Sequence, residues 1–131
     1  MIGIDTNVLV RFLTGDDQKQ AAQARAFLER AAESSAPIFV SDIVMCEVVW
    51  VLSFSYEVSR SELVTVLRQL IRTRQLTFSS VDLLARAIDR FSAGKGDFSD
   101  YLIAEHAKEE ECKSVVTFDR ALLKEEGFSE P

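Results

Sequence analysis

The chain opens with Met1-Ile2-Gly3-Ile4-Asp5-Thr6-Asn7-Val8-Leu9, a short apolar run that changes at Asp5 into polar residues suited to a turn and a helix cap. The run predicts a buried strand, and the residues that follow predict a helical turn over Val8–Leu13, closed by Gly15. A strand that passes directly into a helix is typical of α/β folds. The first residues therefore favour that fold class.

The same alternation continues along the chain. Further short apolar runs predict strands at Pro37–Val40, Leu76–Phe78 and Ser114–Phe118. Apolar residues at helical spacing predict a helix from Asp16 or Asp17 to Ala32, a buried helix over Ile43–Leu52, a helix from Ser59 to about Arg74, one over Val81–Phe91, one from Asp97 or Ser99 to about Glu111, and a last turn over Ala121–Glu126. Residues 1–131 are thus expected to form a single α/β domain, in which helices sandwich a small parallel sheet of four to five strands.

Composition limits the class of protein. The chain is 47% hydrophobic and 27% charged, and it has no apolar run long enough to span a membrane. It shows no features of a signal peptide, so we expect a cytoplasmic protein in which Cys46 and Cys112 are free thiols. The net charge of −6 argues against a nucleic-acid partner, but Arg60, Arg68, Arg72 and Arg74 cluster in fifteen residues. Charge therefore leaves the partner open.

Four acidic residues stand where predicted strands end or predicted helices begin, namely Asp5, Glu47, Asp100 and Asp119. Each borders apolar sequence, where a carboxylate is costly unless it is paired or coordinated. In parallel sheets the carboxyl ends of the strands meet at the edge where ligands bind. Several anions at one point require a cation between them, so the pattern predicts a divalent-metal site.

Each acid also has a simpler explanation. Asp5 and Asp119 can cap the turns that follow them, and Asp97 or Asp100 can cap its own helix. Glu47 has no charged partner three or four residues away, so its alternative is an ion pair with a distant arginine. The single histidine, His106, is interpreted as a surface residue, and Cys46 as core packing rather than a metal ligand.

Four stretches together resemble the PIN-domain nucleases, and within them the short VapC-type toxins: Asp5-Thr6-Asn7-Val8-Leu9, Glu47 in an early helix, Asp97-Phe98-Ser99-Asp100-Tyr101-Leu102-Ile103-Ala104, and Val116-Thr117-Phe118-Asp119-Arg120. The resemblance covers nearly the whole chain. It departs at Gly94-Lys95-Gly96, where a lysine precedes the third stretch, and beyond Phe128, where the chain ends so soon that the family's last edge strand is in question.

The resemblance implies a metal-dependent endoribonuclease that acts on tRNA or rRNA with Mg²⁺ or Mn²⁺. It implies that Asp5, Glu47, Asp100 and Asp119 form the catalytic set, with Asp97 as an additional metal ligand. Thr6, Asn7 and Thr117 match supporting positions. It further implies a homodimer and a small antitoxin protein as partner.

The residue types fit this chemistry, because carboxylates are hard ligands suited to Mg²⁺ or Mn²⁺. We expect hydrolysis by a metal-activated water in line with the leaving 3′ oxygen, which gives 5′-phosphate and 3′-hydroxyl ends. Asp5 and Asp100 would bind the principal ion, and Glu47 and Asp119 a second ion or the water. Two alternatives stay open: a phosphatase with Asp5 as nucleophile, although Asn7 stands where such enzymes carry a second acid, and a catalytically inactive PIN-like binding module.

Overall fold

The computed structural model describes residues 1–131, which divide into two compact units, Met1–Ser79 and Ser80–Pro131. The protein is an α/β chain, as predicted, with helices and parallel strands alternating through both units. The order of elements is β1 (Ile2–Gly3), α1 (Thr6–Thr14), α2 (Gln18–Glu33), β2 (Ile38–Phe39), α3 (Asp42–Ser55), α4 (Arg60–Ile71), β3 (Leu76–Thr77), α5 (Val81–Ala93), α6 (Phe98–Glu109), β4 (Val115–Val116), the 3-10 turn η1 (Leu122–Lys124) and β5 (Phe128–Ser129).

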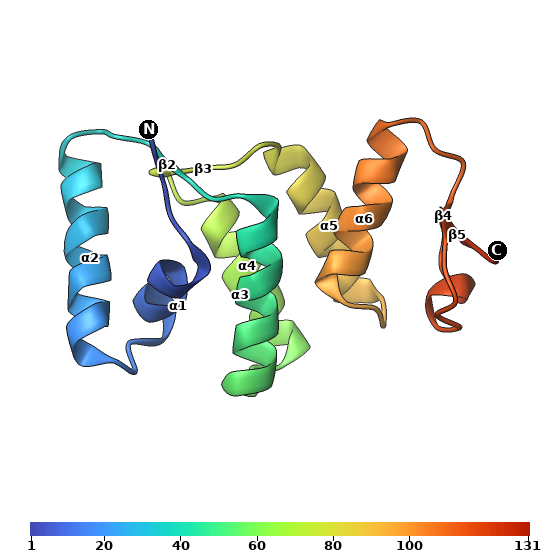
Figure 1. Cartoon of the computed structure of the whole chain (residues 1–131), viewed down its shortest axis with the longest axis horizontal. Helices are drawn as coiled ribbons and strands as arrows, with labels where there is room; N and C mark the ends of the chain where they lie inside the picture. Colours follow the sequence, from blue (N-terminus) through green and yellow to red (C-terminus); the bar gives the residue numbers. More distant parts are fainter. The chain divides into compact units, whose positions relative to one another are not determined.

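The first unit is built on a three-stranded parallel sheet with the order β1-β2-β3. Ile2 pairs with Ile38, and Ile38 pairs with Leu76, so the strands leave the sheet at the same edge. In Figure 1, α1 and α2 lie side by side in this unit, and α3 and α4 follow β2 in the chain. The predicted parallel sheet is confirmed in this unit.

Side-chain caps explain where the helices of the first unit begin. Asp17, one of the two caps proposed for α2, accepts a hydrogen bond from the N–H of Gln20 at 3.0 Å. Ser41 and Ser59 accept from the third residue of α3 and α4 in the same way, which satisfies N–H groups that lack a partner within the helix. The predicted start sites of α3 and α4 are therefore confirmed to within a residue.

One face of α3 differs from the prediction of a helix buried all round. Val44, Met45, Val48, Val49 and Leu52 are buried, but Ile43, Trp50 and Phe54 are 70%, 42% and 80% exposed, and Glu47 is exposed between them. Ile43, Glu47, Trp50 and Phe54 recur at helical spacing and so share a face. Sequence alone could not separate this face from the buried one, because both carry large apolar side chains.

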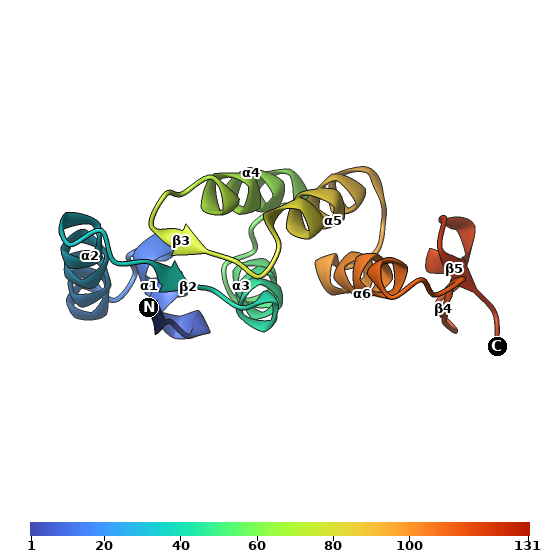
Figure 2. The same ribbon diagram turned by 90° about the horizontal axis from the view of Figure 1, so that it is seen from above.

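The second unit consists of α5 and α6 followed by a two-stranded parallel ladder. The two helices lie side by side in Figures 1 and 2, and the rings of Phe91 and Phe98 pack edge to face with centroids 5.9 Å apart. Strand β4 pairs with β5, Val115 opposite Phe128. The five strands therefore lie in two ladders, three in the first unit and two in the second.

Strand β5 corrects one expectation, since the last edge strand was in question beyond Phe128. Two residues suffice for it because Arg90 of α5 holds the segment: its guanidinium donates to the Glu126 carbonyl and lies over the Phe128 ring, 5.7 Å from the centroid. Two helices end earlier than predicted, α4 at Ile71 and α6 at Glu109. No helix of the chain is both long and apolar enough to span a membrane.

Candidate active site

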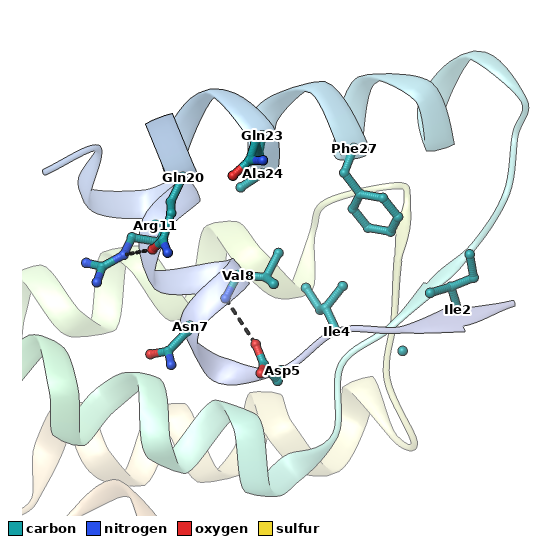
Figure 3. Close-up of a pocket in the computed structure, with 11 residues that line it drawn as sticks. Ile2, Ile4, Asp5, Asn7, Val8, Arg11, Gln20, Gln23, Ala24 and Phe27 are labelled. Carbon is teal, nitrogen blue, oxygen red and sulfur yellow. Dashed lines mark hydrogen bonds between the residues drawn. The ribbon is translucent and has the colours of Figure 1, made fainter. Parts of the chain in front are cut away.

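Asp5 lies at the carboxyl edge of the first sheet, where it caps α1. Its Oδ1 accepts a hydrogen bond from the N–H of Val8 at 3.2 Å, so the capping role considered from the sequence is real (Figure 3). The side chain is exposed, and Oδ2 has no part in the cap. Continuing the register beyond the pair of Gly3 and Phe39 places Asp5 level with Ser41, the cap of α3. Helices α1 and α3 thus begin at the same edge.

A cavity of about 650 Å³ adjoins Asp5 within the first unit. Figure 3 shows Ile4, Val8 and Phe27 around an apolar hollow, with Asp5 and Asn7 along one side. Thr6, predicted as a supporting residue, is buried as the first residue of α1, and Asn7 is exposed. Of the two polar neighbours of Asp5, only Asn7 faces this cavity.

Glu47 stands in the second turn of α3, on the exposed face of that helix. Its neighbour Cys46 is half-buried, and burial together with the charges of Asp42 and Glu47 raises the pKa of the Cys46 thiol to about 11. A thiol with that pKa is protonated at neutral pH, and only the thiolate is a good metal ligand. The interpretation of Cys46 as a packing residue agrees with its surroundings, and both cysteines are free, as predicted.

In the second unit, Asp97 and Asp100 flank the first turn of α6. Asp97 is the N-cap residue, and its N–H donates to Oδ2 of Asp100 at 2.8 Å. Such reciprocal bonding between the cap and the third helical residue is typical of a capping box. The bond holds Oδ2 of Asp100 at the start of the helix, and Oδ1 of Asp100 takes no part in it. Of the two proposed starts of α6, Asp97 is therefore the correct cap.

Asp119 follows β4 and shapes the turn into η1. Its Oδ1 accepts from the N–H of Ala121 at 2.9 Å, and its own N–H donates to Oγ1 of Thr117 at 3.0 Å. Thr117, predicted as a supporting residue, thus contacts the backbone of Asp119 directly. The hydroxyl and the turn together hold the carboxylate at the end of the strand.

The acids of the second unit are close enough to act on each other electrostatically. Partial burial raises the pKa of Asp100, and the hydrogen bond from Asp97 opposes this. The negative charges of Asp97, Asp119 and Glu125 raise it further, and the net shift is upward. Glu125 was not singled out from the sequence, because only the fold of η1 brings it near Asp100. An accumulation of repelling carboxylates is the electrostatic condition in which a bound cation is stabilising.

The predicted site residues are divided between the two units. Asp5, Glu47, Thr6 and Asn7 belong to Met1–Ser79, whereas Asp97, Asp100, Asp119 and Thr117 belong to Ser80–Pro131. No three His, Cys, Asp or Glu side chains form a ready-made metal-binding group. Apart from Asp100, which is partly buried, the five acids are exposed. Apolar neighbours in the sequence therefore do not by themselves bury an acid: Glu47 is exposed on the same face of α3 as Ile43 and Trp50.

Two arginines of the second unit have structural partners. Arg86 Nε lies 2.8 Å from Oε1 of the buried Glu105, and Arg90 Nη1 lies 3.7 Å from Oε2 of the same carboxylate. His106, next in the chain, is exposed, as predicted. The exposed arginines of the cluster noted in the sequence are Arg68, Arg72 and Arg74, around the end of α4.

Comparison of the whole sequence with known proteins indicates its family. The model of the PIN domain matches residues 2–126, which takes in all five acids and runs across both units. The chain belongs to the PIN-domain family. This PIN domain is also 28% identical over 121 residues to a VapC ribonuclease of Aquifex aeolicus (strain VF5), an alignment that covers 92% of this chain and 89% of that protein.

Proposed function

We propose that this PIN domain is a metal-dependent endoribonuclease that acts as the toxin of a toxin–antitoxin pair. The observation that carries the proposal is that Asp97, at the start of α6, and Asp119, after β4, lie near enough to act on the Asp100 carboxylate, in a chain that the PIN model spans from residue 2 to 126. The similarity to a VapC ribonuclease supports RNA as the substrate.

We further propose that residues 1–131 work as a single domain in which the acids of both units serve one site. Asp5 and Glu47 of the first unit and Asp97, Asp100 and Asp119 of the second are the proposed set of metal-binding acids. The family match supports this, because it spans residues 2–126 and so extends over both units.

The donor set fits Mg²⁺ or Mn²⁺. All five side chains offer carboxylate oxygens, which these hard ions prefer, and the neighbouring thiol of Cys46 is held protonated. When bound, a divalent ion supplies an activated water and neutralises charge on the phosphodiester. Asp5 and Asp100 are proposed to hold the principal ion. Glu47 and Asp119 would hold a second ion or orient the water, and Asp97 would be an additional ligand.

Other residues of the chain are proposed to hold the acids and the RNA in place without taking part in the reaction. Thr117 steadies the segment that carries Asp119, and the capping box sets the spacing of Asp97 and Asp100. Thr6 and Asn7 are the proposed supporting residues beside Asp5. Lys95 and Lys124 line a hollow of about 390 Å³ together with Glu125. We assign these two lysines to the phosphates of the RNA strand, where they would set its position without reading its sequence.

The proposed function also includes its partners. An RNA of the tRNA or rRNA class is the proposed substrate, a small antitoxin protein the proposed inhibitor, and a homodimer in the cytoplasm the proposed form of the protein. The similarity to a VapC ribonuclease supports this assignment as a whole.

Cleavage of labelled total RNA by the purified protein tests the proposal. Discrete cuts with Mg²⁺ or Mn²⁺, absent with EDTA and in Asp5→Asn, are expected. The Asn side chain can still accept the bond from Val8, so loss of activity cannot be ascribed to loss of the α1 cap. Folded protein that makes no metal-dependent cuts would instead favour the inactive binding module. Phosphate trapped covalently on Asp5 would favour the phosphatase.

A further inference from the structure

The hydroxyl of Tyr101 joins three segments of the second unit. The side chain is fully buried, and its Oη accepts a hydrogen bond from the N–H of Gly96 at 2.8 Å. It donates to the carboxylate of Glu125, whose two oxygens lie 2.9 Å and 2.8 Å away. One hydroxyl can make both bonds, because it has one proton to donate and lone pairs to accept. The loop before α6, the helix itself and the end of η1 thus meet at one atom.

The two glycines of this loop are required by how closely the backbone lies against that hydroxyl. A Cβ at Gly94 would overlap the Tyr101 hydroxyl and would lie 2.5 Å from Oε1 of Glu125. A Cβ at Gly96 would lie 2.7 Å from Cδ2 of Leu122 and 3.2 Å from Oδ2 of Asp100. The loop therefore lies closely against the Tyr101–Glu125 bond, which explains the glycines at positions 94 and 96.

Two of the proposed metal ligands, Asp97 and Asp100, are sequence neighbours of the residues that this hydroxyl joins. Asp97 follows Gly96, whose N–H is held by the hydroxyl, and Asp100 precedes Tyr101 in the chain. The N–H of Asp97 in turn bonds Asp100, so the position of the loop determines the spacing of the two carboxylates. Repulsion among these acids favours their separation, whereas the link through Tyr101 opposes it.

We propose that Tyr101 and Glu125 are positioning residues that hold Asp97 and Asp100 in the arrangement that binds the cation. Tyr101 fixes the loop through Gly96, and Glu125 fixes the Tyr101 hydroxyl. This inference rests on the proposed function, because it assumes that Asp97 and Asp100 are metal ligands. Glu125 acts through its hydrogen bond and not as a ligand, so a neutral acceptor in its place preserves the arrangement.

The test compares Tyr101→Phe, Glu125→Ala and Glu125→Gln with the wild-type protein in Mn²⁺ titrations and in RNA cleavage. Tyr101→Phe and Glu125→Ala are expected to weaken Mn²⁺ binding about tenfold and to lower kcat at saturating RNA, because the carboxylates that bind the cation are held less firmly. Glu125→Gln keeps an oxygen that accepts the bond and is expected to stay within about twofold of wild type. The double variant Tyr101→Phe/Glu125→Ala should be no worse than either single one, because both remove the same link.

Tyr56→Phe is the matched control. Tyr56 is the only other tyrosine, and its hydroxyl also bonds a carboxylate, that of Asp16, in the first unit. The Tyr56→Phe variant should leave Mn²⁺ affinity unchanged. Amide exchange gives a second readout: the Gly96 N–H should lose protection in Tyr101→Phe and keep it in Glu125→Gln.

The outcomes separate this inference from the proposed function. A wild-type protein that neither binds Mn²⁺ nor cuts RNA contradicts the proposed function. A wild-type protein that does both, beside a Tyr101→Phe variant that matches it, overturns the positioning role. If Glu125→Gln is as impaired as Glu125→Ala, the charge of Glu125 is what counts and the inference is again wrong.

Discussion

Arg86 and Glu105 form an ion pair in which Nε lies 2.8 Å from Oε1, and only 4% of the Glu105 side chain is exposed. Arg90 approaches the second oxygen of the same carboxylate and continues to the Glu126 carbonyl. Glu105 thus lies within ion-pair distance of both arginines of α5, one of which holds the C-terminal segment. These arginines serve the packing of α5, α6 and β5. We therefore do not assign them to the phosphates of a nucleic acid.

Replacing Glu105 with Ala is expected to destabilise the protein by about 2–3 kcal/mol in urea unfolding. Removing one partner of a buried ion pair leaves the other charge without compensation. Because Arg86 and Arg90 are partly exposed, the loss of unfolding free energy should be smaller than for a pair that is buried on both sides. Glu109→Ala provides the control, since Glu109 also bonds Arg86 but is 58% exposed. It should cost at most about 1 kcal/mol. Equal losses in the two variants would show that Glu105 has no special role.

Asp100→Asn should stabilise the metal-free protein at neutral pH. The pKa of Asp100 is raised above the ordinary 3.8, so its ionised form is less favourable in the folded than in the unfolded chain. This penalty is absent below pH 3.8 and grows as the pH rises from 3.8 through the raised value. Thermal unfolding in EDTA should therefore show a higher Tm for the variant at pH 7, and a difference that shrinks at pH 3.5. A lower Tm at pH 7 would contradict this account.

The two cysteines should differ in reactivity. Cys112 is exposed, whereas the half-buried Cys46 has a pKa raised to about 11 and is almost entirely protonated at pH 7.5. Iodoacetamide at that pH should modify Cys112 first, and Cys46 should gain reactivity steadily as the pH approaches 10. Mass spectrometry of the peptides measures both rates, with Cys112→Ser as the reference for Cys46 alone. Rapid modification of Cys46 at pH 7.5 would be inconsistent with its burial.

Gly94→Ala should cost about 2–3 kcal/mol, because the added methyl group overlaps the Tyr101 hydroxyl and forces the loop to shift. Gly15→Ala isolates the cost of backbone strain alone: Gly15 has φ of 67°, and a Cβ added there would meet nothing within 4 Å. That variant should lose about 1 kcal/mol. Denaturant unfolding compares the two, and equal losses would remove the steric explanation.

Local signals in the sequence predicted most of the elements. Strands and helices were found where hydrophobic periodicity and caps such as Asp17, Ser41 and Ser59 marked them. The short strand β5 was missed because its stability comes from Arg90, which lies far away in the chain. Helix ends without a marker, as at Ile71, were placed too late.

For the site, sequence could single out candidate acids but not how they are held. Asp97, Asp100 and Asp119 were identified from their places after strands and at helix starts. Glu125 was missed because its link to Asp100 depends on the path of η1, which no local pattern encodes. The exposure of Glu47 was missed because the apolar residues around it occupy both faces of α3.

Mn²⁺ binding by calorimetry, in Asp5→Asn and Asp100→Asn beside wild type, tests most directly whether acids of both units serve one centre. Asp82→Asn, which alters an exposed carboxylate at the start of α5, is the control and should bind as wild type does. Asp5→Asn and Asp100→Asn are each expected to weaken the same Mn²⁺ binding event at least tenfold, although the two residues belong to different units. Wild-type Mn²⁺ affinity in Asp5→Asn, with binding lost only in Asp100→Asn, would contradict a shared site.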